Sequence, residues 1–110
     1  IEQQGLCMSR ELIYHFGWDE NKARSNQKKH EVSLPLATTV FRDALALTVY
    51  DGGHSEDEER WVTLGCATNG QFLVVIHTAS WVGAAEMKVR IISARLAERD
   101  EIREYEEIPR

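Results

Sequence analysis

Alternation of hydrophobic and polar side chains dominates the second half of the chain, and this period of two is typical of half-buried β-strands. One segment, residues 72–78, is apolar on both sides and therefore predicts a central strand. Asn69-Gly70 comes just before it and predicts a type I′ hairpin turn, in which both residues have positive φ. Residues 81–85 are expected to form a loop. Strands are predicted at residues 14–18, 44–50, 60–68, 72–78 and 88–94.

Three other segments carry the signals of helix starts. Asp19 is a good N-cap for a helix over residues 20–29, which has an acidic residue in its first turn and lysines in its last. Ser33, followed by a proline in the first turn, predicts a second helix over residues 34–41. A third helix is predicted over residues 98–107.

These elements predict an α+β fold with two N-terminal helices, a small antiparallel β-sheet meander and a C-terminal helix. Strands that follow one another through short loops favour an antiparallel meander, and the helices are expected to cover one face of the sheet. With 110 residues the chain has room for one domain, which we place at residues 14–110. Residues 1–13 are expected to be a disordered N-terminal extension.

Composition excludes several classes of protein. No apolar run reaches membrane-spanning length and no signal peptide is visible, which predicts a cytoplasmic protein without membrane contact. The spacing of Cys7 and Cys66 indicates two reduced thiols. The acidic stretch 51–59 lacks the ligand spacing of a calcium or zinc site, so no metal is expected. Phosphate-binding loops and the GxSxG and CxxC motifs are also absent from the sequence.

Charge is distributed unevenly along the chain. The formal net charge of −5 argues weakly against nucleic-acid binding, but basic residues cluster at 22–29 and 88–103. In the last predicted strand, alternation places Arg90 and Arg95 on opposite faces. A guanidinium group suits phosphate because its planar fork donates two parallel hydrogen bonds. Spacing alone supports a phosphate-binding role and a structural role equally for these two arginines.

Five further residues have chemistry of interest beside a plainer structural explanation. Lys22, Asn26 and His30 recur every four residues on one side of the first predicted helix, and a solvated helix face is the better interpretation by itself. His77 lies within the central strand, where a buried, hydrogen-bonded histidine is the default. Arg60 is adjacent to two glutamates, so an ordinary ion pair explains it.

Three motifs in this order resemble the BrnT family of bacterial type II toxins. They are W-D-x-x-K-x-x-x-N-x-x-K-H at residues 18–30, H-x-E-x-E-E-R at 54–60, and R-I-I-S-A-R at 90–95, with Glu101 and Tyr105 downstream. The resemblance spans nearly all of the chain between residues 16 and 107. The chain departs from the family pattern in its longer start, its apolar segment around residues 79–85, and a glutamate at position 31 where glycine is common.

The resemblance implies a RelE-like ribonuclease fold and a metal-independent, cofactor-free cleavage of RNA that blocks translation and growth. It also implies a neutralising BrnA-like antitoxin that forms a hetero-oligomer with the toxin and carries the contacts to operator DNA. RNA cleavage without metal uses the 2′-hydroxyl as nucleophile, so the protein supplies a base, an acid and positive charge. We assign the charge to Arg90 and Arg95, with Arg60 in support. Candidates for moving protons are His30, Lys29 and Glu101.

RNA binding beyond the reacting phosphate is assigned to Trp18, Lys22 and Tyr105, with the aromatic rings as stacking surfaces. Two alternatives remain open from the sequence. In one, the basic strand and helix are a non-catalytic binding module that docks an antitoxin and operator DNA. In the other, the chain is an inactive toxin kept for assembly of a complex.

Overall fold

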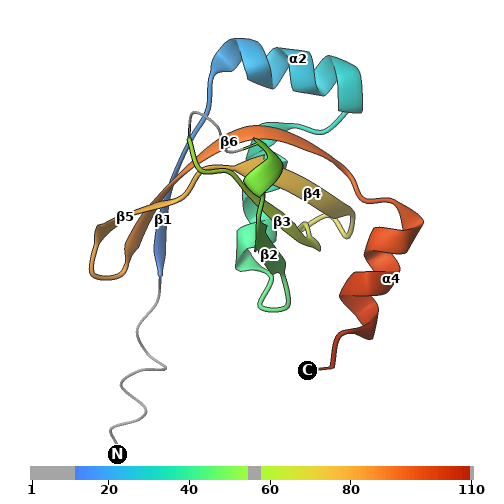
Figure 1. The fold of residues 1–110 in the computed structure, drawn as a ribbon. Coiled ribbons are helices and arrows are strands. Elements are labelled where there is room, and N and C mark those ends of the chain that lie inside the picture. Colours follow the sequence, from blue (N-terminus) through green and yellow to red (C-terminus); the bar gives the residue numbers. More distant parts are fainter. Residues whose placement is uncertain (1–11, 55–57, 110) are drawn as a thin grey trace, which may run out of the picture.

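The computed structural model describes residues 12–54 and 58–109 (Figure 1). Residues 1–11 of the predicted extension and residues 55–57 of the second motif lie outside the described residues, while Ile13 already belongs to a strand. No described helix is long and apolar enough to cross a membrane. The elements are β1 (Ile13–Gly17), α2 (Glu20–His30), α3 (Leu34–Thr38), η1 (Thr39–Arg42), β2 (Leu47–Tyr50), η2 (Gly52–His54), β3 (Trp61–Cys66), β4 (Phe72–His77), β5 (Ser80–Gly83), β6 (Glu86–Leu96) and α4 (Arg99–Glu107).

The six strands form one mixed sheet in the order β1-β6-β4-β3-β2, with β5 paired to β6. The predicted antiparallel pairing is confirmed for β2, β3, β4 and β6. It is wrong for β1, which pairs in parallel with β6 from Ile13 opposite Glu86 to Gly17 opposite Arg90. Parallel strands need a long connection, and here the whole of the chain between β1 and β6 supplies it.

The segment predicted as a loop over residues 81–85 is also corrected, because most of it is a strand. β5 forms a hairpin with β6, in which Ser80 pairs with Lys88 and Trp81 with Met87, and β6 accordingly begins at Glu86. All four residues of β5 are exposed. A strand that is exposed on both sides gives no alternating pattern, so the sequence held no signal for it.

A β-bulge in β6 changes which side chains share a face. Ile76 of β4 pairs with Ser93 and His77 pairs with Ile91, so Ile92 is an extra residue without a partner on β4. The insertion shifts the alternation by one position. Arg90 and Arg95 therefore lie on the same face of β6, and the prediction that they lie on opposite faces is wrong.

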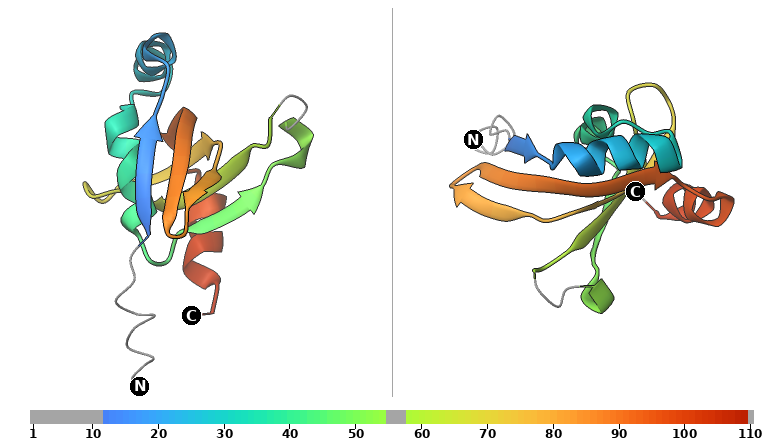
Figure 2. Two further views of the ribbon diagram at one scale, coloured as in Figure 1. Left: turned by 90° about the vertical axis from the view of Figure 1, so that its left-hand side faces the viewer. Right: turned by 90° about the horizontal axis from the view of Figure 1, so that it is seen from above.

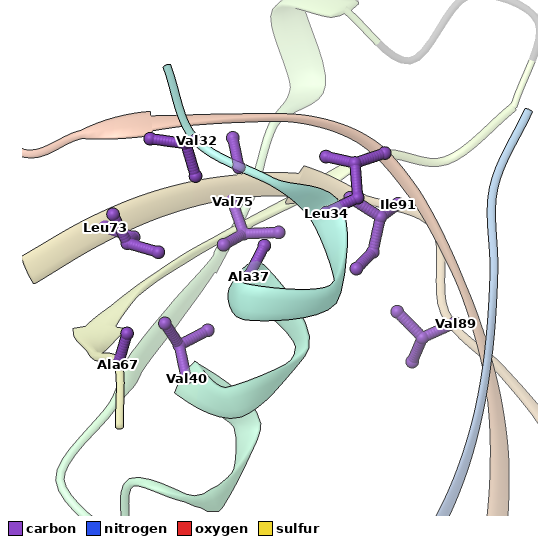
Figure 3. Close-up of a cluster of buried hydrophobic side chains, with 10 residues drawn as sticks. Val32, Leu34, Ala37, Val40, Ala67, Leu73, Val75, Val89 and Ile91 are labelled. Carbon is purple, nitrogen blue, oxygen red and sulfur yellow. The ribbon is translucent and has the colours of Figure 1, made fainter. Parts of the chain in front are cut away.

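Two hydrophobic clusters lie on opposite faces of the sheet. The larger one packs α2, α3 and η1 against β4 and β6 around Leu73, Val75 and Ile91 (Figure 3). The smaller one joins Tyr105 of α4 to Leu64 and Val74. Neighbouring residues of a strand point to opposite faces, so Val74 and Val75 cannot serve the same layer. The expectation that all helices cover one face is therefore wrong, and Figure 2 shows α4 set apart from α2 and α3.

Local turn chemistry shifts several predicted boundaries. Gly70 has φ 90° but Asn69 has no positive φ, so the turn is not type I′. The bonds from Gly70 N to Ala67 O (2.9 Å) and from Ala67 N to Gln71 O (2.7 Å) instead fit a type I turn followed by a glycine in the left-handed region. Upstream, the Asp43 carboxylate accepts a bond from Leu45 N (2.9 Å), and this turn delays the start of β2 to residue 47.

Candidate functional site

Helix α2 is fixed along β6 by a capped start and a buried amide. The Asp19 carboxylate accepts bonds from Asn21 N (2.8 Å) and Lys22 N (3.1 Å), which satisfies two donors of the first turn. The Asn26 side chain donates to Ala94 O (2.9 Å) and Val32 O (2.8 Å) and accepts from Ala94 N (3.0 Å). Asn26 is therefore a clamp between α2 and β6 rather than a member of a solvated helix face.

This clamp divides the predicted site residues into two groups. Trp18, just before α2, lines one cavity together with Arg90 of β6, and Asn26 contacts Ala94 further along the same strand. Helix and strand therefore run side by side in the same direction, as Figure 1 shows. One group of residues gathers near the start of α2 and the other near its end.

The first group, which we call the Glu58 cluster, consists of Glu58, Arg90, Arg60 and Lys22. A guanidinium nitrogen of Arg90 donates to both carboxylate oxygens of Glu58, and each side chain of this ion pair is a little over a third exposed. The hydrogen bond from Arg90 lowers the pKa of Glu58 most, and the charges of Arg90, Arg60 and Lys22 lower it further against the opposing effect of burial. Three cations thus surround one carboxylate that is ionised at neutral pH.

A cavity of about 530 Å³ lies between Arg90, the one residue of this cluster that lines it, and the start of α2. Trp18, Lys88 and Arg90 line it, so an aromatic ring and two cations face one space. The Trp18 ring is half-buried because it also packs against the larger hydrophobic cluster. An aromatic ring beside cations suits a nucleotide, whose base stacks on rings and whose phosphate binds cations.

The second group centres on Arg95, which binds Glu101 through two parallel hydrogen bonds of 2.9 and 2.8 Å. These bonds raise the pKa of Arg95, and they are the largest cause of the lowered pKa of Glu101. Glu101 also accepts a bond from Glu98 N (2.8 Å) and completes a capping box at the start of α4. Arg95 therefore holds α4 in place as well as presenting a guanidinium group on the same face as Arg90.

Lys29 and His30 lie in the last turn of α2, away from the Glu58 cluster. His30 lies eight positions after Lys22, which is about 12 Å along a helix axis. Within residues 12–54 and 58–109, the side chains of Lys29 and His30 make no hydrogen bond or ion pair. The structure thus leaves both side chains available at the end of α2 but does not bring them to Arg90.

Tyr105 has a structural role. Its side chain is buried, its ring packs edge-on against Phe72 at 5.1 Å, and its hydroxyl donates to the Asp43 carboxylate at 2.6 Å. The same carboxylate accepts a bond from Cys66 N (2.9 Å) and so ties α4 to the turn before β2. A buried ring offers no face for a base, so the predicted stacking role does not fit this geometry.

His77 is buried at 2% exposure, as the central-strand position predicts. Its Nδ1 lies 3.0 Å from Thr78 O, a carbonyl that only accepts, so Nδ1 carries the proton. Burial lowers the pKa of His77, which keeps the ring neutral, and Nε2 therefore accepts from the Thr63 hydroxyl at 2.7 Å. The Thr63 oxygen then accepts in its 2.9 Å contact with Thr48, whose hydroxyl is the donor.

Glu58 is the functional candidate that sequence reasoning missed. Its place in the motif at residues 54–60, directly before Glu59 and Arg60, was a signal, but proximity in sequence pointed to Arg60 as its partner. The partner Arg90 is 32 positions away and is brought to it only by the sheet. In the described part of the chain, no three His, Cys, Asp or Glu side chains gather as metal ligands would.

Comparisons with known proteins agree with this architecture. The model of a family described as "Ribonuclease toxin, BrnT, of type II toxin-antitoxin system" matches residues 18–101. Among solved structures, the ribonuclease toxin BrnT of Brucella abortus is similar at a TM-score of 0.56 and 22% identity, covering 79% of this chain and 99% of that one. At that identity the likeness shows a shared fold. A comparison with curated proteins found no match.

Proposed function

This chain belongs to the BrnT family of ribonuclease toxins of type II toxin–antitoxin systems, and we propose that it cleaves RNA without a metal ion and thereby inhibits translation and growth. The observation that carries the proposal is the Glu58 cluster. One guanidinium nitrogen of Arg90 binds both oxygens of a carboxylate, and Arg60 and Lys22 lie close by, so this group of cations also suits a phosphate. An RNA phosphate would replace Glu58 on Arg90.

The cluster supplies what the reaction needs. The 2′-oxygen attacks the neighbouring phosphorus, the bond to the 5′-oxygen breaks, and a cyclic phosphate and a free 5′-hydroxyl result. Glu58, displaced from Arg90 but still ionised, accepts the proton of the 2′-hydroxyl, and Lys22 donates a proton to the departing 5′-oxygen. Arg90 and Arg60 stabilise the negative charge that builds on the phosphate oxygens. Trp18 stacks a base in the adjoining cavity.

Arg95 has a secondary role in this proposal. Arg95 lies five positions beyond Arg90 on β6, at about 3.3 Å per position, so the two guanidinium groups contact different parts of a bound RNA. Arg95 binds a neighbouring phosphate after releasing Glu101. The competing location for the reaction is the Arg95 end of β6. There, proton transfer would fall to the residues that the sequence suggested for it, His30, Lys29 and Glu101.

A pair of double variants separates these locations. Arg90→Ala with Lys22→Ala should abolish cleavage of a defined RNA, whereas Arg95→Ala with His30→Ala should leave a measurable rate. The reverse result would move the reacting phosphate to Arg95. Circular dichroism of each variant shows whether the fold is intact, which matters most for Arg95 because it anchors α4.

The partner that this family implies is an antitoxin, and we propose a BrnA-like protein that binds the toxin in a cytoplasmic hetero-oligomer and carries the contacts to operator DNA. A RelE-like ancestry of the fold belongs to the same proposal. The test of the toxin–antitoxin proposal is to induce expression with and without the antitoxin, and to measure growth and the integrity of cellular RNA on gels. We expect growth arrest and RNA fragmentation, both of which the antitoxin relieves.

One observation favours a non-catalytic alternative. Arg90 and Arg95 lie on one face and each already binds a carboxylate, so the same face would also receive acidic side chains of an antitoxin. Under that alternative, expression leaves growth and RNA unchanged while the protein still binds its antitoxin.

A further inference from the structure

A second cavity, of about 410 Å³, lies on the other side of the sheet from the Arg90 face, beside His77. It opens between the start of β3 and the β5–β6 hairpin. Its size falls in the range of sites that hold small ligands. We call it the aromatic cavity because Trp61, Trp81, Tyr14 and Phe41 form much of its wall.

Trp81 is the feature of this cavity that folding does not explain. It is 62% exposed within β5, next to Val82 at 56%. Trp61 is only half-buried and makes an edge contact with Tyr50 at 5.2 Å. Two tryptophans that line one cavity without being buried offer flat surfaces on which a base can stack.

The aromatic rings of the cavity carry hydrogen-bond donors, namely the Tyr14 hydroxyl and the indole N–H groups of Trp61 and Trp81, whereas its other polar groups do not donate to a ligand. The hydroxyl proton of Thr48 is directed to Thr63, because Thr63 in turn donates to His77, so the Thr48 oxygen presents only lone pairs to the cavity. Both nitrogens of His77 are already engaged, by Thr63 and by Thr78 O. Neither group has a donor left for a ligand.

Glu59 adds a carboxylate to this acceptor set. It lines the cavity, is exposed, and makes no hydrogen bond or ion pair in the described part of the chain. Its neighbour Glu58 is, by contrast, held by Arg90. A ligand that fits must therefore be flat, to stack on the tryptophans, and must present adjacent N–H donors to the carboxylate.

Guanine is the nucleobase that meets this requirement. Its Watson–Crick edge carries the N1–H and N2–H₂ donors side by side, which match the two oxygens of a carboxylate. Adenine and cytosine present one amino group beside a ring acceptor, and uracil flanks its N–H with two carbonyls that repel a carboxylate. We propose that the aromatic cavity is a nucleobase pocket that selects guanine. This rests on the ribonuclease function proposed above and adds the base that the enzyme reads.

The position of the pocket fits that role. Residues 58–61 contribute alternately to the two sites, with Glu58 and Arg60 in the Glu58 cluster and Glu59 and Trp61 in the aromatic cavity. One short stretch of chain therefore links base recognition to the phosphate site. A nucleotide bound in the cavity is placed at the same end of the sheet as Arg90.

Binding of the four nucleoside 5′-monophosphates to the full chain tests the proposal. Tryptophan fluorescence and the NMR signal of the Trp81 indole N–H measure this binding. All four share one phosphate, so differences among them report on the base. GMP should bind at least about tenfold more tightly than AMP, CMP or UMP. Glu59→Gln should remove this preference, and Trp81→Ala should weaken all four by about tenfold.

Glu58→Gln is the matched control, since it changes the adjacent carboxylate and should preserve the preference for GMP. Equal binding of the four nucleotides, or a preference for GMP that survives Glu59→Gln, would contradict the proposal that this cavity selects guanine. These outcomes are separable from those of the cleavage assay. RNA cleavage without guanine preference contradicts only the pocket, and guanine binding without cleavage contradicts only the ribonuclease proposal.

Discussion

Arg90 and Arg95 point from the same face of β6 although they are five positions apart, a spacing that places side chains on opposite faces of a regular strand. The cause is the bulge at Ile92, which lies between the pairs Ile91–His77 and Ser93–Ile76. On that face, Arg90 binds Glu58 and Arg95 binds Glu101. One added residue thus turns a strand with two isolated arginines into a surface on which both can meet an extended polyanion.

The Asn26 clamp should be a large contributor to stability. Asn26→Ala removes three hydrogen bonds and leaves buried backbone groups of Val32 and Ala94 without their partner, so we expect a loss of about 3 kcal/mol in the free energy of unfolding. Chemical denaturation measures it. Gln27→Ala, on the exposed side of the same helix, is the control and should change the free energy by less than about 0.5 kcal/mol. Similar values for both variants would contradict the clamp.

Tyr105 should matter for folding and not for RNA. Tyr105→Phe keeps the buried ring and removes the 2.6 Å bond to Asp43, so it should cost about 1.5 kcal/mol of stability and leave the cleavage rate unchanged. Thermal unfolding and a cleavage assay below the melting temperature check the two halves. A folded Tyr105→Phe variant with impaired cleavage would restore a direct role for this residue.

Glu31 occupies a conformation that favours glycine. Its φ of 58° follows the last turn of α2, where its N–H bonds to Gln27 O at 2.9 Å. Glu31→Gly relieves the strain but adds freedom to the unfolded chain, so we expect a net gain of about 0.5 kcal/mol. Glu31→Ala keeps the strain and should bring no gain. Urea denaturation of the three proteins distinguishes a conformational effect from the loss of a charge.

His77 should make the fold sensitive to mild acid. Its pKa is lowered from 6.5 in the folded protein by burial, so below that pH the unfolded chain binds more protons than the folded one. Stability is therefore fully present above about pH 6.5 and falls as the pH drops towards the folded pKa, by at most about 1.4 kcal/mol per pH unit.

The measurement is the free energy of unfolding against pH, with and without His77→Gln, which should flatten this part of the curve. His15→Gln, on an exposed residue, is the control. An NMR titration gives a reading that does not depend on whether the variant folds. Protonation of the His77 ring at or above pH 6.5 would contradict the assignment.

Much of the fold follows from local patterns in the sequence. Asp19 and Ser33 are the N-caps that their residue types predict, and the strands β3 and β4 appear where alternation and apolarity place them. These features depend on neighbours in the chain, so the sequence is sufficient for them. The exposed strand β5 and the parallel pairing of β1 depend on distant partners, and no local pattern encodes them.

The candidate site was predictable in its residue types but not in its arrangement. Arg90, Arg60 and Lys22 lie around Glu58, and Trp18 lines a cavity together with Arg90. The bulge at Ile92 defeated the prediction of faces, because strict alternation assumes one partner for each residue. Glu58 was missed because its partner Arg90 is 32 positions away, in β6.

The central claim is that Arg90 supplies the charge for metal-independent cleavage of RNA. The most direct measurement is the single-turnover cleavage rate of a defined RNA in EDTA, for the unaltered protein, for Arg90→Ala, and for Arg99→Ala as an exposed arginine outside the cluster. We predict that the unaltered protein and Arg99→Ala cleave at similar rates, while folded Arg90→Ala is slower by about two to three orders of magnitude. A folded Arg90→Ala protein that cleaves at the unaltered rate would contradict the account.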